Sequence, residues 1–431
     1  MTFNPLKEKG TPLDKQLRSW HDIVHRPFNK NDVDCYTRTR QIFMNGIEVE
    51  AWNFKHHFAR VTNNDELKGL LGQIRRIEDM HQTTVNWLGP EDQTILETTL
   101  GYEQVAVDLT AWLAQNEPDD YVKETFDFGL LEDFDHLYRY SQWAYMMHGI
   151  NPNDILQTQT DVIVGRPTQH HHNDNALRLR KHYDKSTTLP QTKVNILTLV
   201  SAEQQTHNYY AEHGFMYGNE NLRETYAEIK DIEEEHVTMY ESLIDPSETM
   251  FEKLLVHEFT EVCNYYNCME DEGDPRIKAI WEEFLSHELE HLRIAKDLFQ
   301  KYEKRDAEEV IGEKIILPCR FFSQKEYVTK VLKKEVDKRL GINKDYLKIK
   351  DLPIDWASYE VQEAVSEDGS PSERTIQLIG VAEGCDIVLA DDSLKNMEVE
   401  LLEKGLQEKS LAPDTVMPKD LANLRKFDLF E

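Results

Sequence analysis

The feature that most constrains this chain is a repeat of acidic and histidine residues along its length. When the sequence is shifted by 155 residues, Glu48 superposes on Glu203 without a gap (203 − 48 = 155). The same shift superposes Glu78 on Glu233, His81 on His236, Glu103 on Glu258, Asp133 on Glu288, and His136 on His291. Self-similarity at a fixed separation indicates a duplicated structural unit, so we expect two copies of one helical domain.

A finer repeat divides each half into two hairpins. Glu48 precedes Glu78 by 30 residues, and Glu103 precedes Asp133 by the same 30 residues (78 − 48 and 133 − 103). The spacing of apolar residues around them predicts helices, which are separated by breaks such as the Gly-Pro pair at positions 89 and 90. Each hairpin offers one carboxylate on its first helix and a carboxylate-x-x-His motif on its second, and the pattern occurs four times.

Some carboxylate-x-x-His matches are expected by chance, but chance matches do not recur at the separation of the repeat. The sequence holds 80 acidic residues and 17 histidines in 431, so isolated matches are expected, and Asp22 with His25 is one that has no repeat partner. Four matches in a common register, each preceded by another acid, are not expected by chance. The alternative is a periodic helical duplication that binds no metal.

The spacing places these side chains together on helix faces that point into a core. Positions i and i+3 lie on one face of a helix, so the carboxylate and the imidazole of each motif point the same way. Apolar neighbours, such as Leu199 near Glu203 and Leu255 near Glu258, indicate that this face is buried. Buried, unpaired carboxylates are costly, and two divalent cations would remove that cost. Four carboxylates and two imidazoles suit iron or manganese better than a metal that prefers thiolates.

The motifs of the second half resemble the signature of the ferritin-like di-iron carboxylate superfamily, which includes ferritins, bacterioferritins and rubrerythrins. The matching residues are Glu203, Glu233-x-x-His236, Glu258 and Glu288-x-x-His291. The resemblance covers residues 41–147 and 192–303. It implies four-helix bundles that each hold two iron ions, with manganese as the alternative metal.

The resemblance also implies a role for each candidate metal ligand. In the second half it implies that Glu233 and Glu288 bridge two ions, and that the terminal ligands are Glu203, Glu258, His236 and His291. In the first half the implied bridging residues are Glu78 and Asp133, and the implied terminal ligands are Glu48, Glu103, His81 and His136. The motifs indicate no catalytic residue beyond these ligands.

Two departures from the superfamily pattern bear on these roles. Asp133 stands where a glutamate is expected and is one methylene shorter, so we expect distorted bridging or a weaker site there. Only 22 residues separate His236 from Glu258 (258 − 236), where ferritins have a long crossover between the second and third helices. The short connection favours an up-down-up-down bundle, and an exchange of helices between the two halves is the other arrangement left open.

The breaks in helical periodicity predict a mainly α fold of two tandem ferritin-like four-helix bundles, with a C-terminal appendage that is α+β or irregular. A Gly- and Pro-containing stretch that includes the run His170-His171-His172 is expected to be a linker with solvated histidines. The predicted ranges are 1–40 for an N-terminal extension, 41–148 for the first bundle, 149–191 for the linker, 192–317 for the second bundle and 318–431 for the appendage.

The charge balance disfavours some classes of partner. The 80 acidic and 49 basic residues give a net charge of −31, which repels nucleic acid and anionic membrane surfaces. The first residues lack the apolar core of a secretory signal, and no apolar run approaches the roughly 18 residues of a membrane span. Five scattered cysteines without a Cys-x-x-Cys motif indicate free thiols. We therefore expect a cytoplasmic protein.

The expected function is that of an oxidoreductase that reduces peroxide or oxygen at dinuclear sites, similar to a rubrerythrin. The four-cysteine iron module of that family is absent from the sequence, so electrons are expected from a separate donor. One alternative is an iron-oxidising or iron-binding protein without an organic substrate, and another is a structural protein without metal. Because the duplication acts as an internal dimer, further oligomerisation is optional.

Overall fold

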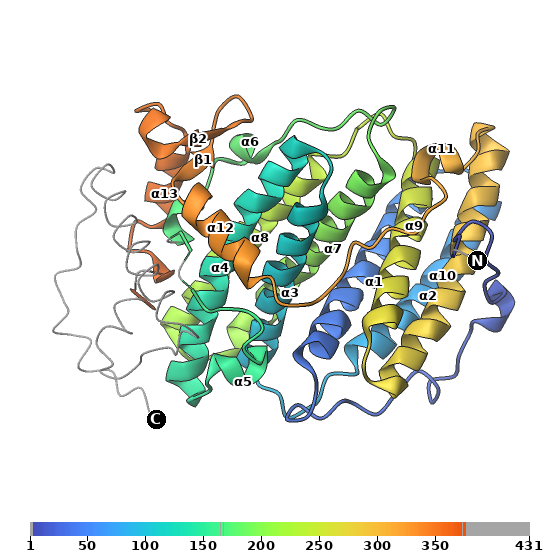
Figure 1. Cartoon of the computed structure of the whole chain (residues 1–431), viewed down its shortest axis with the longest axis horizontal. Coiled ribbons are helices and arrows are strands. Elements are labelled where there is room, and N and C mark those ends of the chain that lie inside the picture. Colours follow the sequence, from blue (N-terminus) through green and yellow to red (C-terminus); the bar gives the residue numbers. More distant parts are fainter. Residues whose placement is uncertain (1–2, 164, 167, 373, 376–431) are drawn as a thin grey trace.

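The fold is built from long helices that follow one another in antiparallel pairs (Figure 1). The computed structural model describes residues 3–163, 165–166, 168–372 and 374–375. The long helices are α1 (Cys35–Val61), α2 (Asp65–Asn86), α3 (Ile95–Asn116), α4 (Asp120–His148), α7 (Pro190–His213), α8 (Glu220–Glu241), α9 (Met250–Asp271) and α10 (Pro275–Glu303). They confirm the predicted mainly α fold.

Shorter elements fill the connections and build a small C-terminal region. They are η1 (Leu13–Lys15), α5 (Pro152–Leu156), η2 (Thr168–His170), α6 (Asn175–Arg178), η3 (Gly214–Met216), α11 (Glu308–Ile311), α12 (Lys325–Glu335), η4 (Ile349–Asp351) and α13 (Ser358–Val365). Strands β1 (Lys338–Leu340) and β2 (Tyr346–Lys348) form an antiparallel pair. This region packs on α4, because α12 contacts that helix and Tyr346 stacks on Phe128. The remainder of the predicted appendage, 376–431, lies outside the described residues.

The helix starts repeat at the same separation as the candidate ligands. Thr94 and Thr249 each form a capping box, one at the start of α3 and the other at the start of α9. The other repeated caps are Asn64 on α2, Asn219 on α8, Asp119 on α4 and Asp274 on α10. Side-chain caps bind backbone N–H groups that the first helical turn leaves without partners. The duplicated sequence therefore determines where these helices begin as well as which face they bury.

The four hairpins combine into two four-helix groups. Group A comprises α1, α2, α9 and α10, and group B comprises α3, α4, α7 and α8. In group A, α1 contacts α9, and in group B, α3 contacts α7 while α4 contacts α8. The groups meet in the middle of the molecule, where α1 contacts α3 and α7. Figure 1 shows group A towards the right and group B towards the left.

Group B is continuous in sequence and is inserted between the two hairpins of group A. The segment 149–189, which lies within the predicted interdomain linker, connects α4 with α7 inside group B. The predicted ranges 41–148 and 192–317 each contribute one hairpin to group A and one to group B. Because both halves carry equivalent hairpins, either pairing brings the same kinds of helix face together, and the repeat alone does not select between them.

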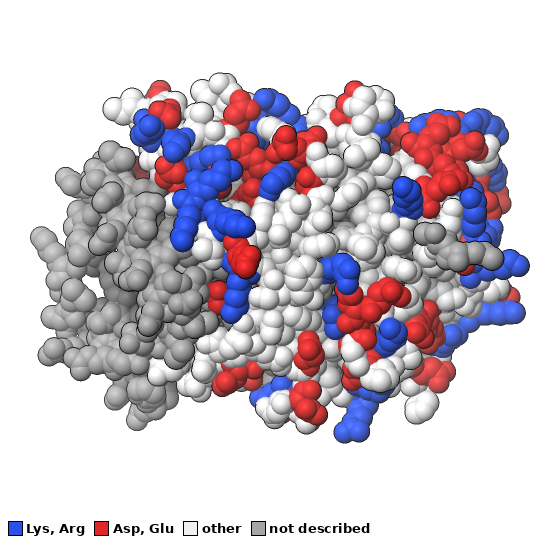
Figure 2. Space-filling view, viewed as in Figure 1, with Lys and Arg blue, Asp and Glu red and all other residues white. Residues whose placement is uncertain are grey.

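Charged side chains are unevenly distributed on the face that Figure 2 shows. Acidic residues gather at the end formed by α10 and α11, and basic residues gather over α12 near the other end. The last turn of α12 contains Lys333 and Lys334. Smaller acidic patches lie elsewhere on this face.

Candidate metal centres

All the candidate metal ligands lie inside the protein. None of the twelve is more than 2% exposed. They project from the eight long helices, and those of each four-helix group converge in its interior. Buried carboxylates and imidazoles require charged or hydrogen-bonding partners, so the surroundings of each polar atom indicate what the site can hold.

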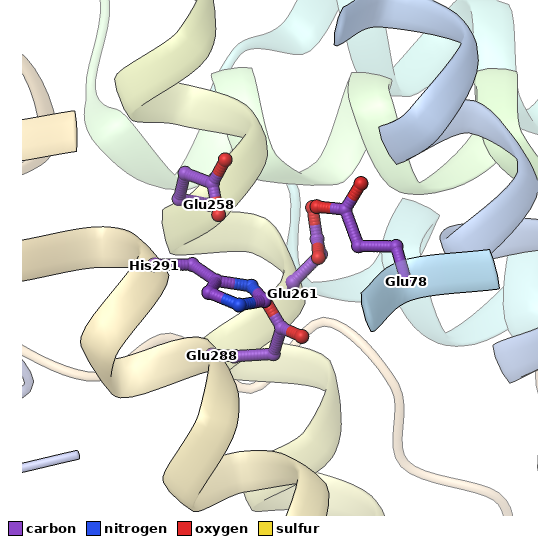
Figure 3. A group of neighbouring side chains, drawn as sticks. All are labelled: Glu78, Glu258, Glu261, Glu288 and His291. Atoms are coloured by element: carbon purple, nitrogen blue, oxygen red, sulfur yellow. The ribbon is translucent and has the colours of Figure 1, made fainter. Parts of the chain in front are cut away.

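Cluster A lies between the helices of group A. Figure 3 shows five of its side chains, which are Glu78 from α2, Glu258 and Glu261 from α9, and Glu288 and His291 from α10. One ligand atom from each of these five residues lies within 4.8 Å of the others. Glu48, His81 and Glu288 form a second ligand set by the same measure. Glu288 belongs to both sets, which places its carboxylate between two candidate ion positions.

Cluster B lies between the helices of group B and also consists of two overlapping ligand sets. The first set is Asp133, Glu203, Glu233 and His236, and the second is Glu103, His136 and Glu233. Glu233 belongs to both sets. Its carboxylate oxygens lie 2.9 Å from Nδ1 of His136 and 3.1 Å from Nδ1 of His236.

Each cluster takes its residues from both halves of the sequence. Cluster A combines Glu48, Glu78 and His81 of the first half with Glu258, Glu288 and His291 of the second. Cluster B combines Glu103, Asp133 and His136 with Glu203, Glu233 and His236. The sequence predicted one complete set within each half, whereas the structure joins half of each set.

The shared carboxylate occupies different repeat positions in the two clusters. The residue equivalent to Glu288 in cluster B is Asp133, whose shorter side chain reaches only to 3.7 Å from Nδ1 of His236. The residue equivalent to Glu233 in cluster A is Glu78, which forms an ion pair with a lysine instead. These two differences leave Glu233 as the shared residue of cluster B and Glu288 as that of cluster A.

Equivalent histidines of the two clusters are held by different partners. In cluster B, Nε2 of His236 lies 2.6 Å from Glu132, whose carboxylate accepts a hydrogen bond from Arg178 at 3.1 Å. In cluster A, Nε2 of His81 lies 2.8 Å from Nδ1 of His287. Glu132 and His287 are themselves 155 residues apart (287 − 132). A carboxylate partner fixes the ring and makes an imidazole a more basic ligand, so His236 is the better supported of the two.

Two carboxylates of cluster B, Asp133 and Glu203, accept no hydrogen bond from the described residues. Both oxygens of Asp133 and both oxygens of Glu203 are buried without a hydrogen bond. Burial and the charge of Glu233 raise the pKa of Glu203 to about 8, and burial and Glu203 raise the pKa of Asp133 well above its usual range. Cations would supply the partners that these oxygens lack. The ligand atoms of cluster B therefore fit a pair of divalent ions.

Glu132 lies outside the ligand sets, and its pKa is lowered where those of Glu203 and Asp133 are raised. Burial works against its ionisation, but Arg178 and His236 lower the pKa of Glu132 to about 2. Its charge therefore persists at neutral pH and is compensated by these two side chains. Sequence reasoning missed both Glu132 and Arg178. Glu132 could have been found because it precedes a candidate ligand and has a repeat equivalent that can also bind a histidine.

Cluster A contains a positive charge of its own. Lys55, which projects from α1, is fully buried and forms ion pairs with Glu78, with Glu258 at 2.9 Å and with Glu261 at 3.5 Å. Burial opposes the charged form, but the three carboxylates raise the pKa of Lys55 well above its usual value. Sequence reasoning missed Lys55 and Glu261. Both follow a ligand at helical spacing, since Lys55 is seven residues after Glu48 and Glu261 is three after Glu258.

The N-terminal extension covers one side of cluster A. The side-chain oxygen of Gln16 lies 2.8 Å from Nε2 of His291, and Gln16 is almost fully buried. A cavity of about 360 Å³ lies between the extension and group A. Its lining includes His81 and also Asp22 and His25, the motif without a repeat partner. A small molecule in this cavity would lie directly beside a candidate ligand.

The histidine run at 170–172 lies beside cluster B, so its predicted position in solvent is wrong. His171 is fully buried, and its ring centre lies 6.0 Å from that of His136. Burial and the neighbouring Arg166 hold the pKa of His171 well below its usual range. His172 is also buried and has Nδ1 3.4 Å from Glu235. His171 and His172 are buried, and His170 partly so, because η2 folds onto α4 and α8.

The described cysteines are free, as the sequence predicted, and the structure shows that they are buried. They are Cys35, Cys263, Cys268 and Cys319. Cys385, the fifth cysteine, lies outside the described residues. No thiolate therefore belongs to the ligand sets found among the described residues.

Comparisons with known proteins identify no family for this chain, so its function is inferred from the candidate metal centres. No protein-family model, curated protein or solved structure matches this chain. Along the described residues, none of the helices combines the length and the apolar character needed to cross a membrane. The chain is a mainly α protein of paired antiparallel helices, with two buried clusters of carboxylates and histidines that could hold metal ions.

Proposed function

We propose that the chain is a ferritin-like, metal-dependent oxidoreductase that reduces peroxide or oxygen in its helical groups. The observation that carries this proposal is that Glu233 belongs to two buried ligand sets in cluster B. Two-metal sites hold their ions close together, so a carboxylate between two ligand sets is suited to such a pair. The long connection 149–189 adds support, because some ferritin-like bundles have a long crossover between helix pairs.

Iron is the metal that we propose, with manganese as the alternative. The ligands in cluster B would be Glu103, Asp133, His136, Glu203, Glu233 and His236. Oxygen and imidazole ligands without thiolate suit these metals. When bound, the ions would supply the redox chemistry that oxygen and peroxide require. The chain itself would position the ligands, hold His236 through Glu132 and Arg178, and keep bulk water away.

Reduction of one peroxide molecule to two water molecules consumes two electrons and two protons. We propose that a separate protein supplies the electrons and that tyrosines carry them to cluster B. Tyr210 donates a hydrogen bond to Glu103, and its ring centre lies 5.6 Å from that of Tyr226. Tyr226 lies 5.8 Å from the ring centre of Tyr217, which is only partly buried. This series of rings connects the cluster with the surface.

The test is the reaction of iron-loaded protein with peroxide and with oxygen. The protein would be loaded with Fe(II) under anaerobic conditions, freed of excess iron and mixed with either oxidant in the presence of a chemical reductant. We expect repeated turnover that is faster than that of the same amount of free iron. The variant Glu233→Ala should lose this activity, whereas Glu234→Ala, on the neighbouring residue outside both clusters, should retain it.

Two results would contradict the proposal. Consumption of both oxidants at the rate of free iron would remove the enzymatic function. A single round of iron oxidation, followed by retention of ferric iron even with reductant present, would identify an iron-oxidising or iron-binding protein instead.

A further inference from the structure

The ion pairs of Lys55 distinguish the two ligand sets of cluster A. Its ammonium faces Glu78, Glu258 and Glu261, which are three of the five residues in the larger set. The fourth carboxylate of that set, Glu288, has one oxygen 2.8 Å from Nδ1 of His291. The larger set therefore already contains a cation that belongs to the chain.

The smaller set of cluster A is not paired with Lys55 in the described part of the chain. Its members are Glu48, His81 and Glu288, and none of them forms an ion pair with Lys55 among the described contacts. Nδ1 of His81 lies 3.3 Å from a carboxylate oxygen of Glu48 and 3.1 Å from one of Glu288, so the three ligand residues converge without Lys55. Ligand atoms from three helices thus lie close enough together to share one ion from solution.

Cluster B differs from cluster A at the positions of Lys55 and Glu261. The residue equivalent to Lys55 is Tyr210, and the residue equivalent to Glu261 is Ala106 (both 155 residues apart). Tyr210 donates a hydrogen bond to Glu103, the residue equivalent to Glu258. A neutral hydroxyl therefore stands in cluster B where cluster A has an ammonium group.

We propose that Lys55 is the resident cation of the larger ligand set, so that cluster A binds one metal ion, at Glu48, His81 and Glu288, while cluster B binds two. This inference rests on the proposed metal-binding function. Carboxylate oxygens bind divalent ions at about 2 Å. An ion on the oxygens that face Lys55 would lie within a few ångströms of its ammonium, and the two positive charges would repel each other.

The extra residues of cluster A occur as a compensating pair. Relative to cluster B, cluster A has one more carboxylate in Glu261 and one more cation in Lys55. The sum of their charges is zero, so their presence leaves the charge of the remaining ligands unchanged. The difference from cluster B is that the ammonium group of Lys55 occupies part of the space between the carboxylates of the larger ligand set.

The experiment is a count of metal ions in each cluster of the full chain. Cluster B would be disabled by Glu203→Ala with Glu233→Ala, and cluster A by Glu48→Ala with Glu288→Ala. Fe(II) and Mn(II) would then be titrated anaerobically, with binding followed by calorimetry and with metal per chain determined by elemental analysis. We expect one ion in cluster A, two in cluster B and three in the unaltered protein.

Exchanging the pair of residues makes the test specific to Lys55. The variant Lys55→Tyr with Glu261→Ala gives cluster A the residues of cluster B, and its count should rise from one to two. The reverse variant, Tyr210→Lys with Ala106→Glu, should lower the count of cluster B from two to one. Tyr210→Phe keeps the ring without adding charge and should leave the count of cluster B at two. Far-ultraviolet circular dichroism would establish that each variant is folded.

The outcomes separate this inference from the proposed function. Two ions in unaltered cluster A, or no increase after the exchange in a folded variant, would overturn the role of Lys55 while metal binding stands. An empty cluster A beside a filled cluster B would also overturn it. No ion in either cluster would instead refute the proposed function. If the exchanged variant of cluster A does not fold, the counts of the unaltered cluster A and of the reverse variant still decide.

Discussion

Clusters A and B are built from equivalent hairpins, yet they compensate their buried charge in different ways. Cluster B has Tyr210 and Glu132 at positions where cluster A has Lys55 and His287. As a result, the lysine of cluster A pairs with carboxylates that are candidate ligands, whereas no lysine in the described part of the chain pairs with the carboxylates of cluster B. The comparison teaches that a duplicated ligand motif does not by itself give two equal sites, because neighbouring residues decide how much charge remains for an ion.

The largest expected effect separates the two shared carboxylates. Glu233→Ala should lower peroxide turnover by at least about 100-fold, because it removes a ligand common to both sets of cluster B and even supporting residues of metal sites alter affinity or activity by about 10- to 100-fold. Glu288→Ala should remove the ion of cluster A and cause a smaller loss of turnover. Steady-state kinetics with metal analysis would measure both. Equal losses of turnover would show that the clusters work as one unit.

The next effect concerns the partners of the equivalent histidines. Glu132→Gln should weaken metal binding in cluster B by about 10-fold or more, because it removes the charged partner of His236. His287→Gln should have a smaller effect on cluster A, since it replaces one neutral hydrogen-bonding partner of His81 by another. Competition with a chelator would give both affinities. A larger loss for His287→Gln would reverse the ranking of the two clusters.

A pH effect is expected in both clusters of the metal-free protein. The pKa of Glu203 in cluster B and that of Glu78 in cluster A are each raised from 4.5 to about 8 by burial, with Glu233 adding to the effect on Glu203. A carboxyl group with a raised pKa stabilises the folded state below its ordinary pKa, and this contribution is lost as pH rises through the folded value. The unfolding temperature of the metal-free protein should therefore fall between pH 4.5 and 8.

Bound metal should reduce this pH dependence, because an ion stabilises the ionised carboxylates. Thermal unfolding followed by circular dichroism, with and without Mn(II), would measure it. Glu203→Gln and Glu78→Gln should each flatten the curve of the metal-free protein. An unfolding temperature that rises over this pH interval would contradict the assignment of raised pKa values.

The smallest effect tests how far the two helical groups are equivalent. Thr94→Ala and Thr249→Ala remove the repeated capping boxes of α3 in group B and α9 in group A. Each should lower the free energy of unfolding by about 1 kcal/mol, and Thr→Ser at the same positions should restore most of the loss. Chemical denaturation would measure these changes. A clear difference between the two caps would show that the groups differ in stability as well as in charge.

The sequence predicted which carboxylates and histidines are buried together, because the information for this is local. A carboxylate and a histidine at i and i+3 share a helix face in any arrangement of the hairpins, so the burial of Glu233 and His236 follows from spacing and apolar neighbours. The pairing of the hairpins was not predictable from the repeat, because it depends on contacts between helices whose patterns are alike.

Other parts of the site depend on tertiary contacts that leave no pattern. Gln16 reaches His291 across 275 residues of sequence, and no local signal joins them. The run that contains His171 was predicted to lie in solvent because its composition is that of a loop. It is buried because the segment folds back onto α4 and α8. The sequence indicates that Lys55 shares a helix face with Glu48 and that Glu261 shares one with Glu258, but it does not indicate that Lys55 and Glu261 form an ion pair.

The insertion of group B between the hairpins of group A determines the order in which the chain can fold during synthesis. All of group B has been made once Glu241 has left the ribosome, whereas α1 and α2 must wait for α9 and α10. The first hairpin to emerge is therefore the last to complete its four-helix group, although α1 can contact α3 and α7 earlier. The ion pair between Lys55 and Glu78 joins α1 to α2, so it can form within that early hairpin. The lysine that we propose as the resident cation of the finished protein would, in the nascent chain, partly neutralise an acidic helix pair that has not yet been covered.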